Sequence, residues 1–380
     1  MRAKSKKKTA WMRPFGLMFN SILGSLSILM LILLVASAYS DYVSPERFII
    51  FAYLGLAFPI LIILNTCLFI FWLLAKKWRL ILIFGLVFVA CWKPLDRYCP
   101  FYPVTPIAED NNVIKVLSYN VMCFAYQGHS NASPNKIIEY IAESGADIVC
   151  LQEYMTGTHS NMMSSAEIAK ALPMYPYISE TIFTPAANKS NKYGLAVLSK
   201  FPITSSRRIN YESAYNGSAI YIINVREKKL VVVNNHLESF KLTAEDRLKY
   251  SDIIKNANFD FFEELGGQIQ QKLGQAFRIR ARQAQTVARE IQKENGYYTI
   301  VCGDFNDTPI SYACRTVRGQ LIDAYAKSGL GPGISYNRNF FMFRIDHIFY
   351  SPTMEAFNCR IDRSIKVSDH YPIKCDLRLN

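Results

Sequence analysis

Apolar residues are distributed unevenly along this chain, and three uncharged apolar stretches precede residue 95. Phe15–Ala38 and Phe48–Ala75 each exceed the roughly 20 residues that a helix needs to cross a bilayer. Leu80–Trp92 is shorter, but Trp78 and Trp92 flank it as interfacial anchors do. The pattern predicts a membrane segment over residues 1–95 with two or three transmembrane helices.

The basic residues around these stretches predict how the segment is oriented. The first thirteen residues carry six basic side chains and no acidic one, so the N-terminus should remain in the cytoplasm, and Lys76, Lys77 and Arg79 should return to that side. If Leu80–Trp92 also spans the bilayer, everything after it is extracytoplasmic; if it does not, the remainder is cytoplasmic. We expect a multi-pass protein of the plasma or inner membrane with an extracytoplasmic globular domain.

The first apolar stretch has an alternative interpretation as a signal peptide. Ala36-Ser37-Ala38 resembles a cleavage site. However, the apolar core is long for a signal peptide, and further apolar spans follow it. A retained helix is therefore the favoured interpretation.

Residues 96–112 separate the apolar part from the remainder of the chain. They contain Pro100, Pro103 and Pro106, a density that disfavours helices and central strands. We expect an extended, proline-rich linker here and a globular domain over residues 113–380.

Short apolar, β-branched runs alternate with helical patterns throughout residues 113–380. The predicted strands are Val113–Tyr119, Asp147–Leu151, Gly194–Leu198, Ala219–Val225, Leu230–Asn234, Tyr298–Cys302, Ile345–Tyr350 and Ile373–Leu377. The predicted helices are Asn135–Glu143 and most of Asp246–Asn295, with a break at Gly266-Gly267. Strands outnumber helices, which favours an α+β domain of packed sheets flanked by helices.

Several predicted strands end in polar residues that a buried strand has no structural reason to carry. The residues that follow strand ends include Asn120, Gln152-Glu153, Asn234-Asn235-His236, Asp304-Phe305-Asn306-Asp307 and Asp346, and Asp369-His370 precedes the last strand. A rigid scaffold can aim catalytic groups from strand ends. Oxygen donors without a thiolate suit Mg²⁺ or Mn²⁺, and carboxylates, amides and histidines together suit phosphate ester cleavage.

The cysteines do not add a metal site to this set. None of the nine forms a CxxC pair, so zinc is disfavoured, and Cys150 and Cys302 lie in runs typical of buried strands. A structural role is favoured for them, and one or two disulfides remain an alternative if the domain faces an oxidising compartment.

Six short strings occur together in a particular order. They are Ser118-Tyr119-Asn120, Leu151-Gln152-Glu153, Asn235-His236-Leu237, Gly303-Asp304-Phe305-Asn306, Arg344-Ile345-Asp346 and Ser368-Asp369-His370. In this order they resemble the motifs of the endonuclease/exonuclease/phosphatase superfamily, which includes deoxyribonucleases, apurinic endonucleases, sphingomyelinases and inositol polyphosphate 5-phosphatases. The resemblance covers roughly residues 113–380 and implies a four-layered α/β sandwich with two central sheets.

The resemblance also implies a set of metal ligands. Glu153 would be the principal ligand of Mg²⁺ or Mn²⁺, with Asn120 beside it. Asp369 would support the metal site.

Catalytic roles follow by the same resemblance. Asp304 would orient or deprotonate the attacking water, and Asn306 would bind the phosphate. His370 would contact the scissile phosphate, with Asp346 setting its tautomer and charge. His236 would bind substrate and assist the leaving group.

The sequence leaves the substrate open. The net charge of +13 is compatible with nucleic acid or with an anionic lipid surface. A membrane segment favours a phosphodiester at the bilayer, such as a lipid head group; an anchored or exported nuclease and a catalytically silent binding module are the alternatives. No obligate protein partner is predicted.

Two features near residue 280 have alternative interpretations. Arg278, Arg280 and Arg282 are interpreted as a solvated helix face rather than a phosphate clamp. The aromatic residues between Phe259 and Phe277 are interpreted as a packed helix pair rather than a lid that dips toward lipid.

Overall fold

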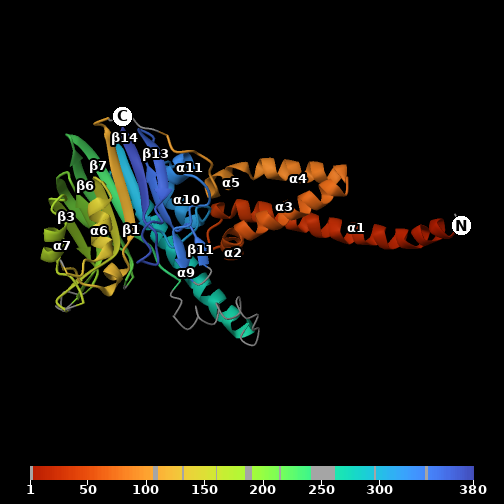
Figure 1. Ribbon diagram of the computed structural model, residues 1–380, viewed down its shortest axis with the longest axis horizontal. Helices are drawn as coiled ribbons and strands as arrows, with labels where there is room; N and C mark the ends of the chain where they lie inside the picture. The colour runs from red at the N-terminus through yellow and green to blue at the C-terminus, as the bar shows by residue number, and fades with distance from the viewer. Residues whose placement is uncertain are drawn as a thin grey trace.

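A computed structural model describes residues 3–105, 110–130, 132–159, 161–184, 191–213, 215–240, 262–294, 297–338 and 341–380. A layered α+β domain forms one end of the molecule, and a helical segment projects from it, with the N-terminus farthest from the domain (Figure 1). The helical segment contacts the domain directly, for example through the ion pair between Asp41 and Arg315.

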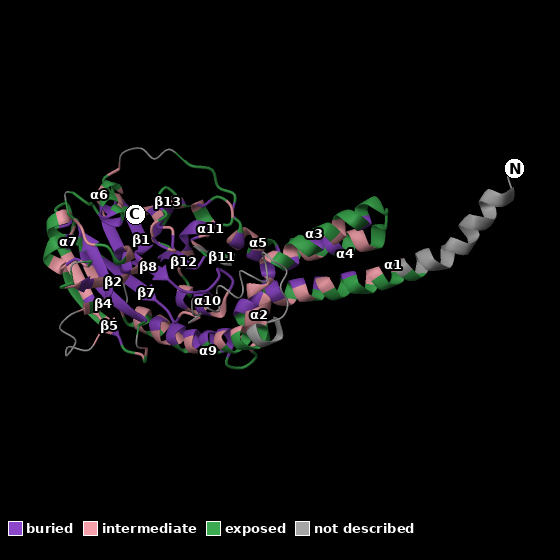
Figure 2. Cartoon of the chain, turned by 60° about the horizontal axis from the view of Figure 1, so that its bottom comes forward, coloured by how far each residue is buried: buried purple, intermediate pink, exposed green. Residues whose placement is uncertain are grey.

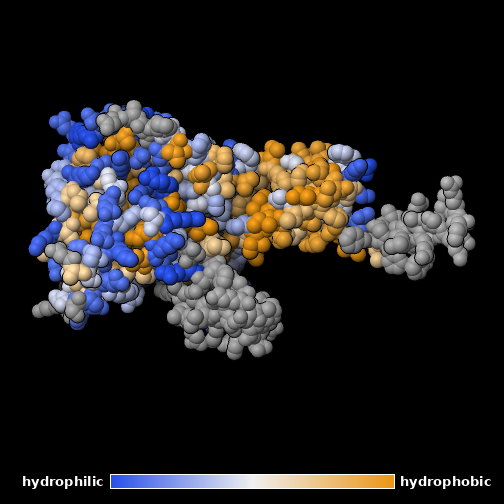
Figure 3. Space-filling view, in the orientation of Figure 1, coloured by the Kyte–Doolittle hydropathy of each residue, from blue (hydrophilic) through white to orange (hydrophobic). Residues whose placement is uncertain are grey.

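The N-terminal part contains the helical elements expected from its apolar stretches. They are α1 (Ala3–Ala38), η1 (Ser40–Tyr42), α2 (Ile50–Leu56), α3 (Phe58–Leu74), α4 (Trp78–Ala90) and α5 (Trp92–Tyr98). Apolar surface is concentrated over α1, α3 and α4, whereas the domain surface is largely polar (Figure 3). Inside the bundle, Asn65 donates to the carbonyl of Met30, and Trp72 donates to Ser27.

Among the described residues, one helix is long and apolar enough on its own to cross a membrane, over Asn20–Ala38. Two further helix pairs satisfy the same criteria only when joined: α2 with α3, bent by 65°, and α4 with α5, bent by 58°. If each bent pair forms one span, there are up to three spans.

Helix α5 continues into the region expected to be an extended linker. It ends at Tyr98, beyond the expected boundary at residue 95. Pro94 does not interrupt this helix, because it lies in the first turn, where proline costs no hydrogen bond. Beyond it, residues near 101 run along the domain: Phe101 forms a bridge with Leu330, and the backbone amide of Tyr102 donates to the carbonyl of Gly329.

The domain contains two six-stranded sheets. The first has the order β13-β14-β1-β2-β4-β3 and the second has the order β5-β6-β7-β8-β12-β9. The strands are β1 (Val113–Asn120), β2 (Ile148–Gly157), β3 (Tyr177–Ile182), β4 (Asn191–Ser199), β5 (Ile203–Ile209), β6 (Gly217–Val225), β7 (Lys228–His236), β8 (Tyr298–Asp304), β9 (Ile322–Asp323), β12 (Asp346–Tyr350), β13 (Met354–Ile361) and β14 (Ile373–Leu379). A separate hairpin pairs β10 (Tyr336–Arg338) with β11 (Phe341–Phe343).

Helices cover the outer faces of both sheets. They are η2 (Met122–Tyr126), α6 (Lys136–Glu143) and α7 (Ser165–Ala171) by the first sheet, and α9 (Phe262–Glu294) and α10 (Tyr312–Arg318) by the second. The short helix α11 (Ala324–Ser328) instead packs into the core between the sheets. Alternate side chains of each sheet pack between the sheets, such as Val116 and Ile148 with Val232 and Ile300. The buried strands form the centre of the domain (Figure 2). The four-layered sandwich expected from the sequence is thus confirmed.

The strands that the sequence did not predict lie at or near the edges of the sheets. β3, β5, β9 and β13 each have one strand neighbour, and most residues of β5 are exposed or only partly buried. Their patterns are weak because an edge strand buries less apolar surface than a central one.

Helix α9 differs from its predicted form. It runs through Gly266 and Gly267 without the expected break, and residues 246–261 lie outside the described part of the chain. Phe277 is buried and packs edge-on against Tyr53 of α2, in agreement with a packed helix rather than a lid; Phe259 and Phe261 lie outside the described residues.

Arg280 corrects the prediction of a solvated arginine face. Arg278 and Arg282 are exposed, but Arg280 is fully buried and pairs with Asp307 at 3.1 Å. Residues two apart on a helix point in different directions, so these three arginines cannot share one face.

Candidate active site

The polar residues at the strand ends meet because of the pairing of the central strands. β1 and β2 are parallel, and so are β7 and β8, so each pair ends at one edge of its sheet. The antiparallel strand β12 begins beside the end of β8, with Asp346 opposite Asp304. The start of β14 pairs with the end of β1, which brings His370 to the same edge. The strand order thus assembles residues separated by up to 250 positions.

Glu153 is positioned by an irregularity in β2. The register between β2 and β4 shifts between Leu151 and Tyr154, and Glu153 has φ of +50°. A bulge of this kind redirects a side chain that would otherwise follow the strict alternation of the strand. Its Oε1 atom accepts a hydrogen bond from Nδ2 of Asn120 at 3.1 Å.

Asn120 joins the two sheets at the site. Its Nδ2 atom also donates to Oδ2 of Asp304 at 3.1 Å, and its Oδ1 atom accepts from the backbone amide of Met122. Asn120 therefore holds the carboxylates of Glu153 and Asp304 on either side of one amide.

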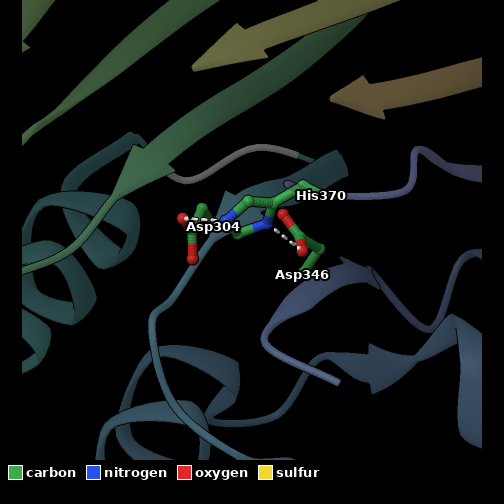
Figure 4. Close-up of side chains that lie close together, drawn as sticks. All are labelled: Asp304, Asp346 and His370. Carbon is green, nitrogen blue, oxygen red and sulfur yellow. Dashed lines mark hydrogen bonds and ion pairs between the residues drawn. The ribbon is translucent and has the colours of Figure 1, made fainter. Parts of the chain in front are cut away.

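Asp304, His370 and Asp346 form a buried chain of side chains (Figure 4). Nδ1 of His370 lies 2.8 Å from Oδ2 of Asp346, and Nε2 lies 3.5 Å from Oδ2 of Asp304. Burial alone would lower the pKa of His370, but the two carboxylates outweigh it and raise that pKa well above its usual value. Burial raises the pKa of Asp304 to about 6, even though the neighbouring His370 opposes this shift.

His236 and Asn306 complete the central set. Nε2 of His236 lies 3.7 Å from Asp304 and 3.9 Å from Glu153, and burial lowers its pKa, which favours the neutral ring. Asn306 has φ of +52°; its backbone amide donates to Asp304 at 2.8 Å, and its side-chain amide donates to the carbonyl of Leu237 at 2.9 Å.

Asp369 lies beside this set, near a strained turn. Met122–Tyr126 has five consecutive residues with positive φ, a conformation that costs roughly 1–2 kcal/mol per residue for side chains other than glycine. The pKa of Tyr126 is raised to about 12, first by Cys123 and then by burial, Glu153 and Asp369. Glu153 and Asp369 therefore both act electrostatically on this turn.

Two serines that received no role in the sequence analysis position the site. Ser368 donates to the carbonyl of Asn120 and accepts from the backbone amide of His370. Ser335 accepts from the backbone amides of Ile345 and Asp346. Ser368 precedes Asp369 in the Ser368-Asp369-His370 string, so its place near the site could be expected. No local sequence pattern pointed to Ser335, because its hydrogen-bond partners are about ten residues away.

A polar layer beneath the site connects the two sheets. Gln152 donates to Asn234 at 2.7 Å and to Ser118 at 3.1 Å, and Asn234 donates to the carbonyls of Leu151 and Ala196. His347, next to Asp346, points away from the site as strand alternation predicts, with Nε2 at 3.0 Å from the carbonyl of Asp307.

The donors fit a hard divalent cation in two groupings. Ligand atoms of Asp304, Asp346 and His370 lie within 4.8 Å of one another and form a candidate metal site. A metal held by His370 would have to displace the ring proton that the raised pKa of this residue favours. Glu153 and Asp304 offer carboxylate oxygens on either side of Asn120, and the Glu153 side chain is 27% exposed, which leaves room for the water ligands that Mg²⁺ retains.

Several solved structures are similar to this chain. An endonuclease/exonuclease/phosphatase from Beutenbergia cavernae shares 17% identity, with a TM-score of 0.48, over 70% of this chain and 72% of that one. A family member from Bacteroides vulgatus shares 18% identity, with a TM-score of 0.48, over 70% and 99% of the two chains. The human nocturnin catalytic domain, solved with a bound sulfate anion, shares 16% identity, with a TM-score of 0.49, over 72% and 97%.

Sequence comparison gives two family matches. No curated protein matches the chain at a significant level. Residues 20–98 match a domain family of unknown function. Residues 117–370, well over half of the chain, match the endonuclease/exonuclease/phosphatase family, whose members include hydrolases of phosphoester bonds. The chain belongs to the endonuclease/exonuclease/phosphatase family.

Proposed function

We propose that this protein is a membrane-embedded, divalent-metal-dependent phosphodiesterase that acts on a lipid head group or a similar phosphodiester. One observation carries the catalytic part: His370 lies between Asp346 and Asp304, and Asn120 joins Asp304 to Glu153. This arrangement links a buried histidine and a buried carboxylate to the partly exposed carboxylate of Glu153 through hydrogen bonds and ion pairs.

Each residue has a proposed role. A bound Mg²⁺ or Mn²⁺, held by Glu153 with Asn120 and Asp369 in support, would offset charge on the phosphate oxygens. Asp304, with its pKa near 6, accepts a proton from the attacking water at near-neutral pH. His370, kept protonated by Asp346, contacts the phosphate and stabilises the added negative charge.

Asn306 and His236 have supporting roles in the proposal. Asn306 uses one amide hydrogen on the carbonyl of Leu237, and its other hydrogen is assigned to a phosphate oxygen. His236, held neutral by burial near Asp304 and Glu153, is assigned to the leaving group.

We further propose that the helices of residues 1–95 cross the membrane three times and that the domain of residues 113–380 is extracytoplasmic. The bent pairs α2–α3 and α4–α5 each satisfy the length and composition criteria for one span. The two family matches also fall on either side of residues 99–116, which supports a boundary there.

The attachment of the helices to the domain supports a substrate at the bilayer. Ser40 donates to the carbonyl of Ile310, close after the loop that carries Asp304 and Asn306. Tyr53 of α2 donates to the carbonyl of Gln270 in α9. These contacts hold the catalytic loop at a fixed position relative to the helices, which suits a substrate that resides in the membrane.

The catalytic proposal is tested on the full-length protein in a neutral detergent. Hydrolysis of bis-p-nitrophenyl phosphate should require Mg²⁺ or Mn²⁺, and Asp304→Ala or His370→Ala should each reduce kcat by about 10²–10⁴-fold. His159→Ala is the control, because His159 is exposed and has no proposed role in the site. Activity that survives chelation of metal, or wild-type inactivity on all substrates, would contradict the proposal.

The substrate class is decided by a direct comparison. The same preparation is assayed on plasmid DNA and on mixed micelles containing sphingomyelin or phosphatidylinositol. Faster turnover of a lipid supports the proposal, whereas faster turnover of DNA would favour a nuclease, with which the net charge of +13 is compatible.

A further inference from the structure

An apolar groove lies between α1 and α4. It has a volume of about 420 Å³ and is lined only by apolar side chains: residues 28–36 of α1 contribute Leu31, Ile32 and Val35 among others, and α4 contributes Ile83 and Val87. Volumes of this size fall in the usual range of ligand pockets, roughly 300–1,000 Å³. A groove without any polar partner suits a hydrocarbon chain.

The seam between these helices continues toward the domain as polar contacts. Tyr39, just after α1, donates to the carbonyl of Ala90 at the end of α4. One step further, Arg97 of α5 pairs with Asp41 of η1 at 3.0 Å. Tyr42 and Trp92 are 60% and 65% exposed at this level, as expected for aromatic residues at a membrane–water boundary.

Three arginines meet at the polar end of the seam; we call Arg97, Arg315 and Arg318 the arginine cluster. Asp41 is shared by Arg97 at 3.0 Å and Arg315 at 3.7 Å. The side chain of Arg318 has no hydrogen bond or salt bridge with any described residue, and burial, followed by the charge of Arg97, lowers its pKa. The positive charge of the cluster thus exceeds what Asp41 offsets, even with Asp323 acting on Arg318 from a distance.

We propose that an anionic phospholipid binds along this seam, with an acyl chain in the groove and its phosphate on the arginine cluster. The inference rests on the proposed membrane embedding of the helices. Guanidinium groups bind phosphate oxygens through paired hydrogen bonds, and a phosphate here offsets the uncompensated positive charge. The lipid joins α1 and α5 to α10, the helix that follows the catalytic loop, and so fastens the domain to the bundle.

Binding is measured by native mass spectrometry of the full-length protein in a neutral detergent. Phosphatidylglycerol and phosphatidylcholine with identical acyl chains are added in equal amounts. Wild-type protein should retain phosphatidylglycerol at least about 10-fold more than phosphatidylcholine. The double variant Arg315→Gln/Arg318→Gln should reduce retention of phosphatidylglycerol by about 30-fold, from roughly 1 kcal/mol per basic residue near a lipid surface.

Two controls separate this site from general attraction to the membrane. Arg47→Gln/Lys93→Gln removes the same charge from exposed positions near the same boundary and should leave retention unchanged. Ala36→Phe fills the groove and should reduce retention, whereas Ile22→Phe, on α1 outside the groove, should not. Arg315→Lys/Arg318→Lys should keep most of the preference, which checks that the glutamine variants have not merely lost their fold.

Equal retention of the two lipids, or unchanged retention in the glutamine double variant, would overturn the inference. The inference would also be overturned if inorganic phosphate displaced phosphatidylglycerol while Ala36→Phe left its retention unchanged. That result would indicate a site for a free anion. Hydrolysis of bis-p-nitrophenyl phosphate is measured in parallel. An inactive wild-type protein that still selects phosphatidylglycerol would contradict the proposed catalysis but support the lipid site.

Discussion

The environment of His370 is the most informative feature at the residue scale. Its ring contacts one carboxylate through each nitrogen, at 2.8 Å from Asp346 and 3.5 Å from Asp304. The backbone amides of Ile345 and Asp346 donate to Ser335, which holds Asp346 in place. The protonated state of His370 therefore depends on groups other than itself.

Replacing Asp346 by Asn should change the pH dependence of catalysis. Because Asp346 raises the pKa of His370, its loss should lower that pKa, and activity should decline at a lower pH than in the wild type. We expect kcat to fall by about 10²–10⁴-fold and the alkaline limb of kcat/KM to move to lower pH. The measurement is a pH profile of bis-p-nitrophenyl phosphate hydrolysis.

Asp323→Asn is the matched control for this prediction, because Asp323 is also buried in the second sheet but caps α11 rather than contacting His370. An alkaline limb that does not move in Asp346→Asn would show that His370 does not need to be protonated.

Gly303 allows close approach of β7 and β8 at the site. It has φ of +129°, and a Cβ atom there would lie 2.0 Å from the backbone oxygen of Asn235. Gly303→Ala should destabilise the protein by about 2–4 kcal/mol and reduce activity, because the strands carrying His236 and Asp304 must separate. Gly266→Ala, in α9 with open space around it, should instead stabilise by about 0.5–1 kcal/mol.

Denaturant unfolding in detergent measures both glycine variants. If Gly303→Ala unfolds at the same denaturant concentration as the wild type, the close contact with Asn235 is not a constraint of the native state.

At the scale of elements, α9 is connected to the catalytic loop by a buried ion pair. Arg280 bonds Asp307 at 3.1 Å and the carbonyl of Glu238 at 2.9 Å, and its guanidinium lies over the rings of Phe240 and Phe277. Asp307 directly follows Asn306, so α9 supports the loop that carries the proposed phosphate contact.

Arg280→Met should cost about 3–5 kcal/mol of unfolding free energy, because it leaves the buried carboxylate of Asp307 without its partner. Arg282→Met removes only an exposed pair with Glu46 and should cost less than about 1 kcal/mol. Thermal unfolding monitored by circular dichroism compares the two. Equal losses in both variants would contradict the assignment of a supporting role to Arg280.

Central and edge strands differ in how well their sequences predict them. β1, β7 and β8 carry long runs of buried residues, so their existence and type follow from the apolar pattern. β3 and β5 contain exposed or half-buried residues at most positions and depend on a neighbouring strand for their hydrogen bonds. Their conformation is decided by the sheet rather than by local preference.

At the scale of the whole molecule, the helical segment packs directly on the domain. Asp41, buried between α1 and the domain, pairs with Arg97 and Arg315, and Arg344 donates to the carbonyl of Arg97. Arg344 precedes Ile345 and Asp346 in the chain, so the contact reaches a segment of the site.

A C-terminal fusion should report an extracytoplasmic domain. Alkaline phosphatase fused after Asn380 should be active in bacterial cells, and a fluorescent protein fused there should be dark, because α4 with α5 is proposed as the third span. Fusions after Lys77 provide the control and should give the opposite result, since the positive-inside rule places Lys76 and Lys77 in the cytoplasm. A fluorescent C-terminal fusion would refute the three-span arrangement.

The sequence by itself determined which helices and central strands this protein forms and which residues are candidates for its site. Apolar length marked the helical segment, apolar β-branched runs marked the central strands, and the order of short polar strings named Glu153, Asp304, Asn306 and His370. These features are local, because each depends on residues that are close together along the chain.

Only the tertiary structure decided which of these residues touch and what state they adopt. The packing of the two sheets brings Asn120 at the end of β1 to Asp304 at the end of β8, and a bulge turns Glu153 toward them. The buried pair of Arg280 with Asp307 joins α9 to the catalytic loop. The arginine cluster beside Asp41 joins segments more than 200 residues apart. Such contacts are set by packing between sheets and helices, and no local pattern encodes them.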